Sequence, residues 1–469
     1  KLQESIVVNL DLGVDSIDID KWMAMADIEK AVIAPPQSQQ KARQGDAPKT
    51  SVSLDMPAKM SELKPAVNAG GLPDDIEAAL NFKADSLTVN GGLVHHARLS
   101  AELSGGEVTI SQFSALLPGS ADVALFGFVV TSDGQPRFEG DMEVAVGDLR
   151  GLMGWLGAPP PPVPSERLRK LTLAGKVMAS ADAISVSGLD IQVDSSRLTG
   201  KTVVRLGKRL SLDADLSLDR INLDAYLLTT AAAPPAPPKI AATTPPAPQG
   251  PTTKVAEAAA INELAVLSVL KDFDANLKAR VETLAYGGAQ IKNVNFDGSV
   301  RGGALNVRNL SVDKLAGSSF KASGEINNLD GIPQLKNINL TAEAADISRL
   351  IRLVGGNVPV DSKKLGMVSF AGKIDGSLLN PQVDLNLKGA GTNLGLVGKV
   401  SLLPIVGGFD GKLKIAHGDI VNMLRSLGVD YRPGGKIGGL NLESLIKADM
   451  SGLTLNDLNA QVGPVKING

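Results

Sequence analysis

The stretch LSLDADLSL, residues 210–218, alternates strictly between an apolar and a polar residue. A period of two is the pattern of a β-strand, because successive side chains of a strand point to opposite faces. Such a strand places one face against something apolar and the other in water. The same alternation returns along much of the chain, so the sequence predicts a mainly β protein.

A second strand pattern changes phase at a glycine. Ile184 and Val186 alternate with polar residues, the phase slips by one at Gly188, and Ile191 and Val193 resume it. A slip of one residue within a strand is typical of a β-bulge or a turn, both of which glycine permits. We therefore expect an irregularity at Gly188 within an otherwise extended segment.

The nonapeptide DSIDIDKWM at residues 15–23 returns in altered form as DRINLDAYL at residues 219–227, and 219 − 15 = 204 positions separate the two. Further matches at a constant offset of 284 − 87 = 197 relate residues 87–113 to residues 284–310. A period of this length indicates one domain-sized unit that is used in tandem.

These matches suggest a division of the chain into five parts. The expected parts are the end of a preceding repeat unit (1–33), a polar linker (34–56), a first repeat unit (57–230), a Pro/Ala-rich linker (231–253), and a second repeat unit with a C-terminal extension (254–469). The chain begins at Lys1 and ends at Gly469 within strand-like patterns, so we interpret it as an internal fragment of a longer protein.

One short helical pattern occurs three times, at residues 148–157, 346–355 and 419–428. Each copy begins with Asp, ends with Gly and carries apolar residues at its second, fifth, sixth and ninth positions. Asp is a favourable N-cap and Gly a favourable C′ residue. The spacing places the four apolar side chains on one stripe. We predict three short amphipathic helices whose stripes face the sheet.

Composition excludes several function classes. The chain has 47 basic and 50 acidic residues, and we find no basic stripe along it, so a nucleic-acid partner is not expected. The absence of cysteine excludes disulfides and thiol catalysis. No apolar run approaches the roughly 18–20 residues of a membrane span. No phosphate loop, nucleophile elbow or dinucleotide fingerprint is present, so we expect neither an enzyme nor a cofactor.

The histidines and the aspartate runs offer little coordination chemistry. His95 and His96 have no acidic residue at ligand spacing, so we expect surface strand positions and no metal. His417 precedes Gly418 and is expected in a turn. The aspartates within 18–20 and 213–219 are spaced by two along strands, so they are expected to project into solvent rather than to form a calcium loop.

The function that we expect is inferred from the apolar face of the predicted strands. Leucine, valine and isoleucine dominate it, and the predicted helices are too short and few to cover a long sheet. A curled sheet with aliphatic side chains, left partly uncovered, forms an apolar groove that suits acyl chains. A closed sandwich or solenoid core is the alternative from patterning alone. The side chains expected to line such a groove are Ile184, Val186, Ile191, Val193, Leu210, Leu212, Leu216, Leu218, Leu305 and Val307.

Four segments of the chain have a recognisable pattern: residues 147–157 with the prolines of 159–164, Leu168-Arg169-Lys170-Leu171, residues 218–227, and LLPGS at 116–120 with the alternating strand that follows it. These segments resemble the AsmA family of Gram-negative bacteria. The resemblance is strongest over residues 80–230 and looser over 260–469. It implies a repeating β-groove, in which a long, curled antiparallel sheet with short amphipathic helices surrounds an apolar channel.

The resemblance also implies a biological setting. Members of the family are similar to bridge-like lipid-transfer proteins, are anchored in the inner membrane by an N-terminal helix and extend into the periplasm. It therefore implies a periplasmic location with an anchor outside this fragment, and phospholipids and envelope proteins of the inner and outer membranes as partners. It brings no catalytic residues.

Two functions stay open at this point. The first is binding or conduction of phospholipid acyl chains along the groove between the two membranes, in support of outer-membrane biogenesis. The second is a non-catalytic scaffold that affects the targeting, assembly and membrane localisation of outer-membrane proteins, which it would recruit by strand addition. An enzyme acting on envelope polymers is a third class, for which the sequence offers no residues.

Overall fold

The structure is a computed structural model. It describes residues 6–24, 76–132, 134–158, 160–227, 273–329, 331–346, 366–401, 408–426, 429–449 and 452–469. The chain divides into two compact units, an N-terminal unit of residues 1–199 and a C-terminal unit of residues 200–469. The predicted linkers lie outside the described residues, as does the middle decapeptide beyond Asp346. The repeat boundaries inferred from the sequence remain predictions.

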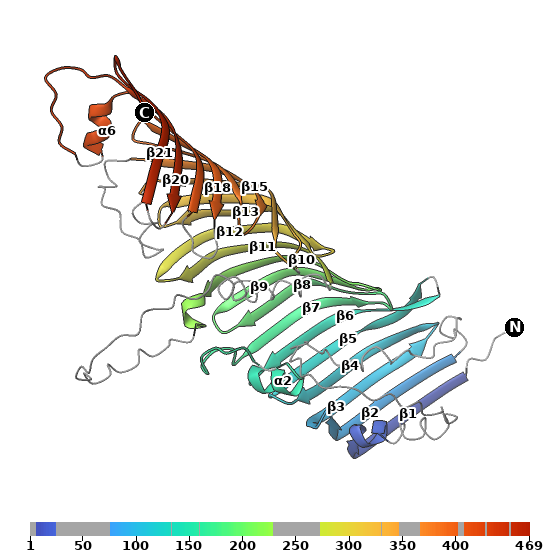
Figure 1. Ribbon diagram of the computed structural model, residues 1–469. Helices are drawn as coiled ribbons and strands as arrows, with labels where there is room; N and C mark the ends of the chain where they lie inside the picture. The colour runs from blue at the N-terminus through green and yellow to red at the C-terminus, as the bar shows by residue number, and fades with distance from the viewer. Residues whose placement is uncertain are drawn as a thin grey trace, which may run out of the picture. The chain divides into compact units, whose positions relative to one another are not determined.

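The N-terminal unit is a curled sheet of long strands joined mostly by tight turns (Figure 1). Its strands are β1 (Ile6–Asp18), β2 (Ile76–Val89), β3 (Gly92–Ser104), β4 (Glu107–Leu117), β5 (Ala121–Ser132), β6 (Gln135–Val146), β7 (Leu171–Ala179), β8 (Ala183–Val193) and the first residues of β9 (Ser196–Leu206). Residues 19–24 are helical and continue β1. A second helix, α2 (Leu149–Trp155), lies between β6 and β7.

The C-terminal unit continues the same construction. Its strands are the rest of β9, β10 (Leu210–Asn222), β11 (Phe273–Tyr286), β12 (Ala289–Arg301), β13 (Ala304–Leu315), β14 (Ser318–Asn327), β15 (Gln334–Ala344), β16 (Val368–Ser377), β17 (Gln382–Gly389), β18 (Thr392–Ser401), β19 (Gly408–His417), β20 (Leu440–Asp449), β21 (Gly452–Val462) and β22 (Val465–Asn468). Its helical segments, among the described residues, are the 3-10 turn η2 (Leu223–Ala225) and α6 (Ile420–Ser426).

The predicted fold class, a mainly β, curled antiparallel sheet with short helices, is confirmed. The described strands belong to one sheet, and most consecutive strands pair in antiparallel fashion. Two junctions differ from the prediction, because β1 pairs with β2 and β10 with β11 in parallel. A parallel pair needs a long connection that returns the chain to the starting edge. The intervening stretches, residues 19–75 and 223–272, supply that length.

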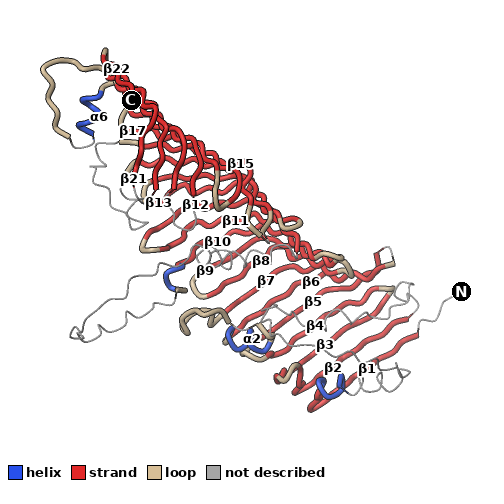
Figure 2. The backbone as a smooth tube through the Cα atoms, in the orientation of Figure 1, coloured by secondary structure: helices blue, strands red, loops and turns tan. Residues whose placement is uncertain are grey.

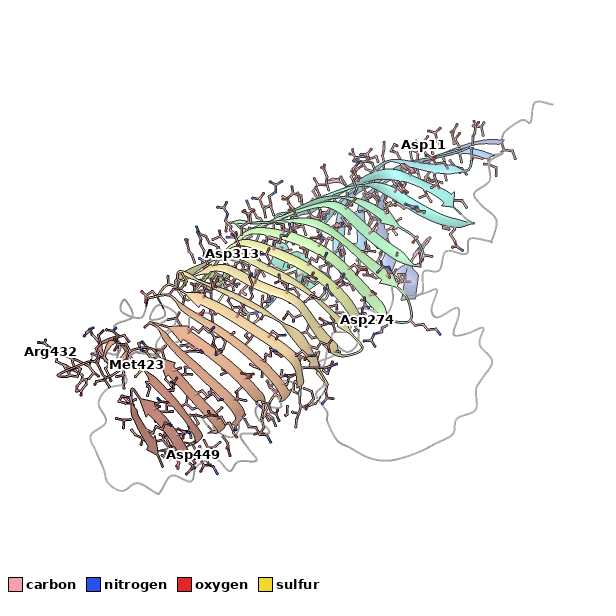
Figure 3. The ribbon with its side chains drawn as sticks, turned by 90° about the horizontal axis from the view of Figure 1, so that it is seen from above. Asp11, Asp274, Asp313, Met423, Arg432 and Asp449 are labelled. Atoms are coloured by element: carbon pink, nitrogen blue, oxygen red, sulfur yellow. The ribbon has the colours of Figure 1, made fainter. Side chains whose placement is uncertain are left out.

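The helical segments that the structure describes in each unit lie along one of the two rows of strand ends of its sheet, which we call the helix edge (Figure 2). In the N-terminal unit, the end of β1 and the connection between β6 and β7 reach this edge, because β1 and β2 are parallel and β2 to β7 alternate in direction. In the C-terminal unit, η2 and α6 follow β10 and β19 at the equivalent edge. Figure 3 shows the two edges of that unit, with Asp313 near the helix edge and Asp274 at the opposite one.

Strand irregularities occur where residues take the left-handed backbone region. Gly188 has φ of 58°, and the β7–β8 register shifts between Ala174 and Lys176. The predicted irregularity at Gly188 is therefore confirmed. His96 and Asn293, which are 197 positions apart, have φ of 52° and 54°. Histidine and asparagine tolerate this region better than most residues, so His96 has a backbone role in its strand that the sequence did not predict.

The buried core of the N-terminal unit is small and lies at the helix edge. One cluster of buried residues is Ala84, Val94, Ala97 and Ala115, with Trp155 of α2 packed against it. A second is Ala121, Val146 and Leu149, with Leu152 and Met153 of α2 among its neighbours. Helix α2 therefore covers the ends of β2 to β6, where the backbone turns, and not the middle of the sheet.

Candidate functional site

Rows of apolar side chains cross the N-terminal unit from strand to strand, on a side that we call the apolar face. Residues that pair directly across strands point to the same side of a sheet. One row, read from the backbone register, runs through Val123, Val144, Leu173 and Ile191. The adjacent row runs through Ala121, Val146, Leu171 and Val193. The apolar face is therefore continuous from β5 to β8.

The C-terminal unit has an apolar face of the same kind, and a single row spans ten strands. It runs through Leu216, Ala279, Phe296, Leu310, Ala322, Leu340, Gly372, Leu385, Leu396 and Leu413. Every member is apolar or glycine. The row ends at Ser444 on β20, a buried residue whose hydroxyl donates to the carbonyl of Asn456 at 2.9 Å.

The predicted groove residues lie on these two faces. On β8, Ile184, Val186, Ile191 and Val193 pair with Ala179, Val177, Leu173 and Leu171 of β7. On β10, Leu210, Leu212, Leu216 and Leu218 pair with Phe273, Ala275, Ala279 and Val281 of β11. Leu305 continues the row of Leu212 through Ala275 and Val300, and Val307 lies beside it opposite Gly298. The structure thus groups four of the ten in the N-terminal unit and six in the C-terminal unit.

None of these ten side chains is fully buried. Ile184 and Leu210 are 40% and 43% exposed, and the other eight are half-buried. Strand β7 shows the contrast between the faces, because Leu171, Leu173 and Val177 are half-buried whereas Thr172 and Lys176 are exposed. A side chain in a closed sandwich core would be nearly inaccessible. Among the residues that the structure describes, the apolar faces are therefore sheltered but not covered by packed protein.

Paired glycines show to which side the sheet bends. A Cβ added at Gly127 would lie 2.3 Å from the carbonyl oxygen of Glu139 and 2.6 Å from the Cα of its partner Gly140. A Cβ at Gly411 would lie 2.2 Å from the carbonyl oxygen of Val397 on β18. Both positions belong to the apolar face, so the neighbouring strands close toward that face at these pairs. The sheet bends sharply at these pairs, which we call creases, and its apolar face lies on the concave side.

The opposite side of each sheet is polar and has shallow hollows. In the N-terminal unit a hollow of about 430 Å³ is lined by nine residues of this side, Asp122, Ala124, Glu143, Ala145, Thr172, Ala174, Asp190, Gln192 and Arg197, together with Val144 and Leu173 from the alternate positions of the same strands. Its counterpart in the C-terminal unit, about 300 Å³, is lined by Ser319, Lys321, Thr341, Ala342, Glu343, Ser369, Phe370, Ala371, Asn386 and Lys388. A larger hollow of about 620 Å³ lies further along the same face, between Lys373 and Asp410.

Several carboxylates of the polar faces form ion pairs with arginine side chains. The guanidinium of Arg197 donates to Asp190 at 2.5 Å, and this hydrogen bond lowers the pKa of the Asp190 carboxyl. The hydrogen bond from Arg308 lowers the pKa of Asp297 in the same way. Exposed pairs of this kind contribute little to stability. They mark the polar faces as ordinary solvated sheet surfaces.

Two aspartates of the repeated nonapeptide have a role that the sequence did not predict. Asp20 was expected to project into solvent, yet its two carboxylate oxygens accept from the backbone N–H groups of Asn90 and Gly91 at 2.8 and 2.7 Å. Asp224, 204 positions later, accepts from Gly287 and Gly288 at 2.7 and 3.1 Å. Each carboxylate therefore caps the first hairpin turn of the strand pair that follows it. We call these contacts the carboxylate clamps.

The first decapeptide forms the predicted helix α2. Asp148 is its N-cap, with Oδ1 accepting from Gly151 N–H at 3.1 Å, and Gly157 has φ of 74° beyond its end. The predicted stripe is wrong at one position, because Leu156 is 54% exposed while Trp155 is packed in its place. Trp155 Nε1 donates to the carbonyl of Val89 at 2.8 Å, and this bond draws the ring onto the turn between β2 and β3.

The third decapeptide forms α6, and its neighbour His417 corrects a prediction. Asp419 accepts from the backbone N–H groups of Val421 and Asn422, as an N-cap should. His417 is the last residue of β19 and is buried, whereas a turn position was expected. Its Nδ1 accepts from Asp419 N–H, so Nε2 carries the proton and donates to the carbonyl of Ala390 at 2.9 Å. His417 therefore joins the helix start to the turn between β17 and β18.

Within the described part of the chain, no three His, Asp or Glu side chains are grouped so that they could share a metal ion. In the same residues, no helix combines the length and the apolar content that crossing a membrane requires. Comparisons with protein-family models, with curated proteins and with solved structures found no match to this chain.

Proposed function

We propose that this chain is an AsmA-like envelope protein that binds or conducts phospholipid acyl chains on its apolar faces, between the inner and outer membranes, in support of outer-membrane biogenesis. The observation that carries the proposal is the row of apolar residues that passes in register through ten strands of the C-terminal unit, in which Gly372 is buried and the other nine are only half-buried. A large apolar surface without a protein cover needs an apolar occupant.

Acyl chains match this surface in chemistry and in shape. The row consists of Leu, Ala, Phe and Gly, which offer dispersion contacts and no directional partner. Each methylene that leaves water contributes about 0.8 kcal/mol, so a chain of about sixteen carbons gains roughly 10 kcal/mol before entropy is subtracted. The headgroup would stay in solvent, because the apolar rows supply nothing to bind it.

The alternative function, a scaffold for outer-membrane proteins, makes a different physical demand. A scaffold that acts through its strand edges gains nothing from an accessible apolar face and is stabilised by covering it. The half-buried state of Val186 and Leu216 therefore supports the lipid proposal. The two functions are separated by asking whether lipid is present and whether the apolar face holds it.

The test combines native mass spectrometry with two matched double variants. Phospholipid should co-purify with the wild-type chain, and Val186→Asp with Leu216→Asp should remove it, because an unpaired carboxylate against hydrocarbon costs several kcal/mol. The control, Ser187→Asp with Asn393→Asp, adds the same charges at exposed positions next to apolar-face residues. Circular dichroism checks that each variant is folded. A folded apolar-face variant that retains lipid like the wild type would exclude the proposal.

A further inference from the structure

Two phenylalanines stand on the polar face of the N-terminal unit. Phe126 and Phe128 of β5 are 51% and 39% exposed, and they pair in register with Asp141 and Glu139 of β6. Met178 of β7, itself 39% exposed, pairs with Glu139 from the other side. These three side chains form what we call the aromatic patch. They point away from the apolar face, so the proposed lipid binding does not use them.

The second copy of the fold shows that the patch is not needed to build the sheet. At an offset of 197, Ser323 and Glu325 of β14 take the places of Phe126 and Phe128. Their register partners on β15 are Asn339 and Lys336, again in antiparallel pairing, although the register shifts between the two pairs. The equivalent strand pair therefore forms with polar residues at both positions. An exposed aromatic pair that folding does not require indicates a contact with another molecule.

The surroundings of the patch are acidic. Asp122 and Glu143 line the hollow beside Phe126. Asp141 is the register partner of Phe126 on β6. Among the described residues these three carboxylates form no ion pair, whereas Glu139 pairs with Arg137 and Asp190 with Arg197. Lys176, the register partner of Asp141, offsets part of the charge. The local excess is negative.

The whole N-terminal unit shares this sign. Residues 1–199 contain 17 basic and 26 acidic residues, a net charge of −9, whereas residues 200–469 contain 30 basic and 24 acidic residues, a net charge of +6. The charges are thus divided between the two units. The long-range field of the N-terminal unit favours a cationic partner.

We propose that the aromatic patch and the adjoining hollow dock a protein segment that carries an aliphatic or aromatic side chain flanked by lysine or arginine. The apolar side chain would pack on Phe126 and Phe128, and the flanking cations would lie over Asp122, Asp141 and Glu143. Aromatic anchors within a ring of complementary charge are the arrangement that concentrates binding energy in protein interfaces.

A membrane surface fits these observations less well. Exposed phenylalanines can enter a bilayer interface, but carboxylates beside them are repelled by anionic headgroups, which attract lysine and arginine. The hollow is also lined by side chains that offer hydrogen bonds at fixed positions, among them Thr172 and Gln192. We therefore favour a polypeptide partner and treat membrane binding as an outcome that would overturn the proposal.

The experiment is selection of a displayed random library of 12-residue peptides on the purified full chain. Enriched peptides should combine Lys or Arg with aliphatic or aromatic residues. The best of them, made synthetically, should bind Phe126→Ser/Phe128→Glu at least tenfold more weakly than the wild type, since that variant takes the residues of the second copy. Lys321→Glu, in the equivalent hollow of the C-terminal unit, is the matched control and should bind like the wild type.

A second variant keeps the test decisive if the first misfolds. Asp122→Asn/Glu143→Gln retains shape and removes charge, so it should weaken the same peptide severalfold and reduce its salt dependence. Enrichment of acidic peptides, undiminished binding to both double variants, or binding of phosphatidylglycerol vesicles that depends on Phe126 and Phe128 would each overturn the proposal. Lipid co-purification should stay unchanged in both variants, so failure here leaves the proposed lipid function untouched.

Discussion

The polar-face hollows of the two units have the same backbone frame and opposite charge. The pair Asp122 and Ala145 of the N-terminal unit corresponds to Ser319 and Glu343 of the C-terminal unit. Ala124 corresponds to Lys321, and Gln192 corresponds to Lys388. Strand register creates the hollow in both places. The side chains that fill it decide which partners each unit attracts.

The apolar faces differ far less. Leu173 and Ile191 in one unit, like Leu385 and Leu396 in the other, continue rows of aliphatic side chains across paired strands. Both units are also creased by paired glycines on that face. The property common to the two copies is therefore a bent aliphatic surface. The polar face is the side on which they have separate chemistry.

The largest expected loss of stability comes from adding a side chain at a paired glycine where the sheet bends. In Gly411→Ala the new Cβ meets backbone atoms at 2.2 and 2.6 Å, so two strands must move apart, and we expect a loss of about 3 kcal/mol in stability. Gly140→Ala should act similarly on the N-terminal unit. Chemical denaturation followed by circular dichroism measures both. Gly395→Ala, whose Cβ meets its first neighbour at an ordinary 3.8 Å, is the control and should be nearly neutral.

Helices α2 and α6 are attached differently, and this difference can be measured. Trp155 occupies the same helix position as Ser426, but its ring packs on a buried cluster and bonds to Val89. We expect Trp155→Ser to destabilise the N-terminal unit by about 2 kcal/mol. Ser426→Ala loses one hydrogen bond within α6 and should cost well under about 1 kcal/mol. Equal losses in thermal melts would contradict this assignment.

The carboxylate clamps should act equally in both units. Asp20→Asn and Asp224→Asn each keep the side-chain shape and weaken two hydrogen bonds to turn N–H groups, so we expect a loss of about 1 kcal/mol from each. Amide hydrogen exchange at Asn90–Gly91 and Gly287–Gly288 reports the local opening. Asp215→Asn, at an exposed strand position, should leave both turns protected. Loss of protection at only one turn would show that the clamps are not equivalent.

The smallest expected effect is a loss of folding stability at low pH. Hydrogen bonds from Arg197 and Arg308 lower the pKa of Asp190 and Asp297 below the value of about 3.9 in an unfolded chain. A carboxyl with a lowered folded pKa contributes stability that is present above the unfolded pKa and is lost as the pH falls through the folded pKa. We therefore expect no change from these groups between pH 7 and 5, and a small loss below about pH 4. Denaturation midpoints of Asp297→Asn against the wild type would show it.

Features that depend on neighbours along the chain could be predicted from the amino-acid sequence. Alternation at 210–218 made strand β10, because side-chain direction follows position within a strand. The slip at Gly188 identified an irregularity, and Asp148 and Asp419 identified helix starts, because each of these is a contact within a few residues. The same alternation identified the ten apolar-face residues, since the parity of a position selects its face.

Features that depend on strand pairing became visible only in the folded chain. The parallel junction of β1 with β2 and the contact of Asp20 with Asn90 join residues 70 positions apart, and no local pattern encodes that register. Trp155 displaced Leu156 from the helix stripe because Val89 lies within its reach. The hollow beside Phe126 likewise exists only once β5 to β8 lie side by side. Local periodicity fixes the direction of a side chain, whereas its neighbours are set by the register of strands that are distant in sequence.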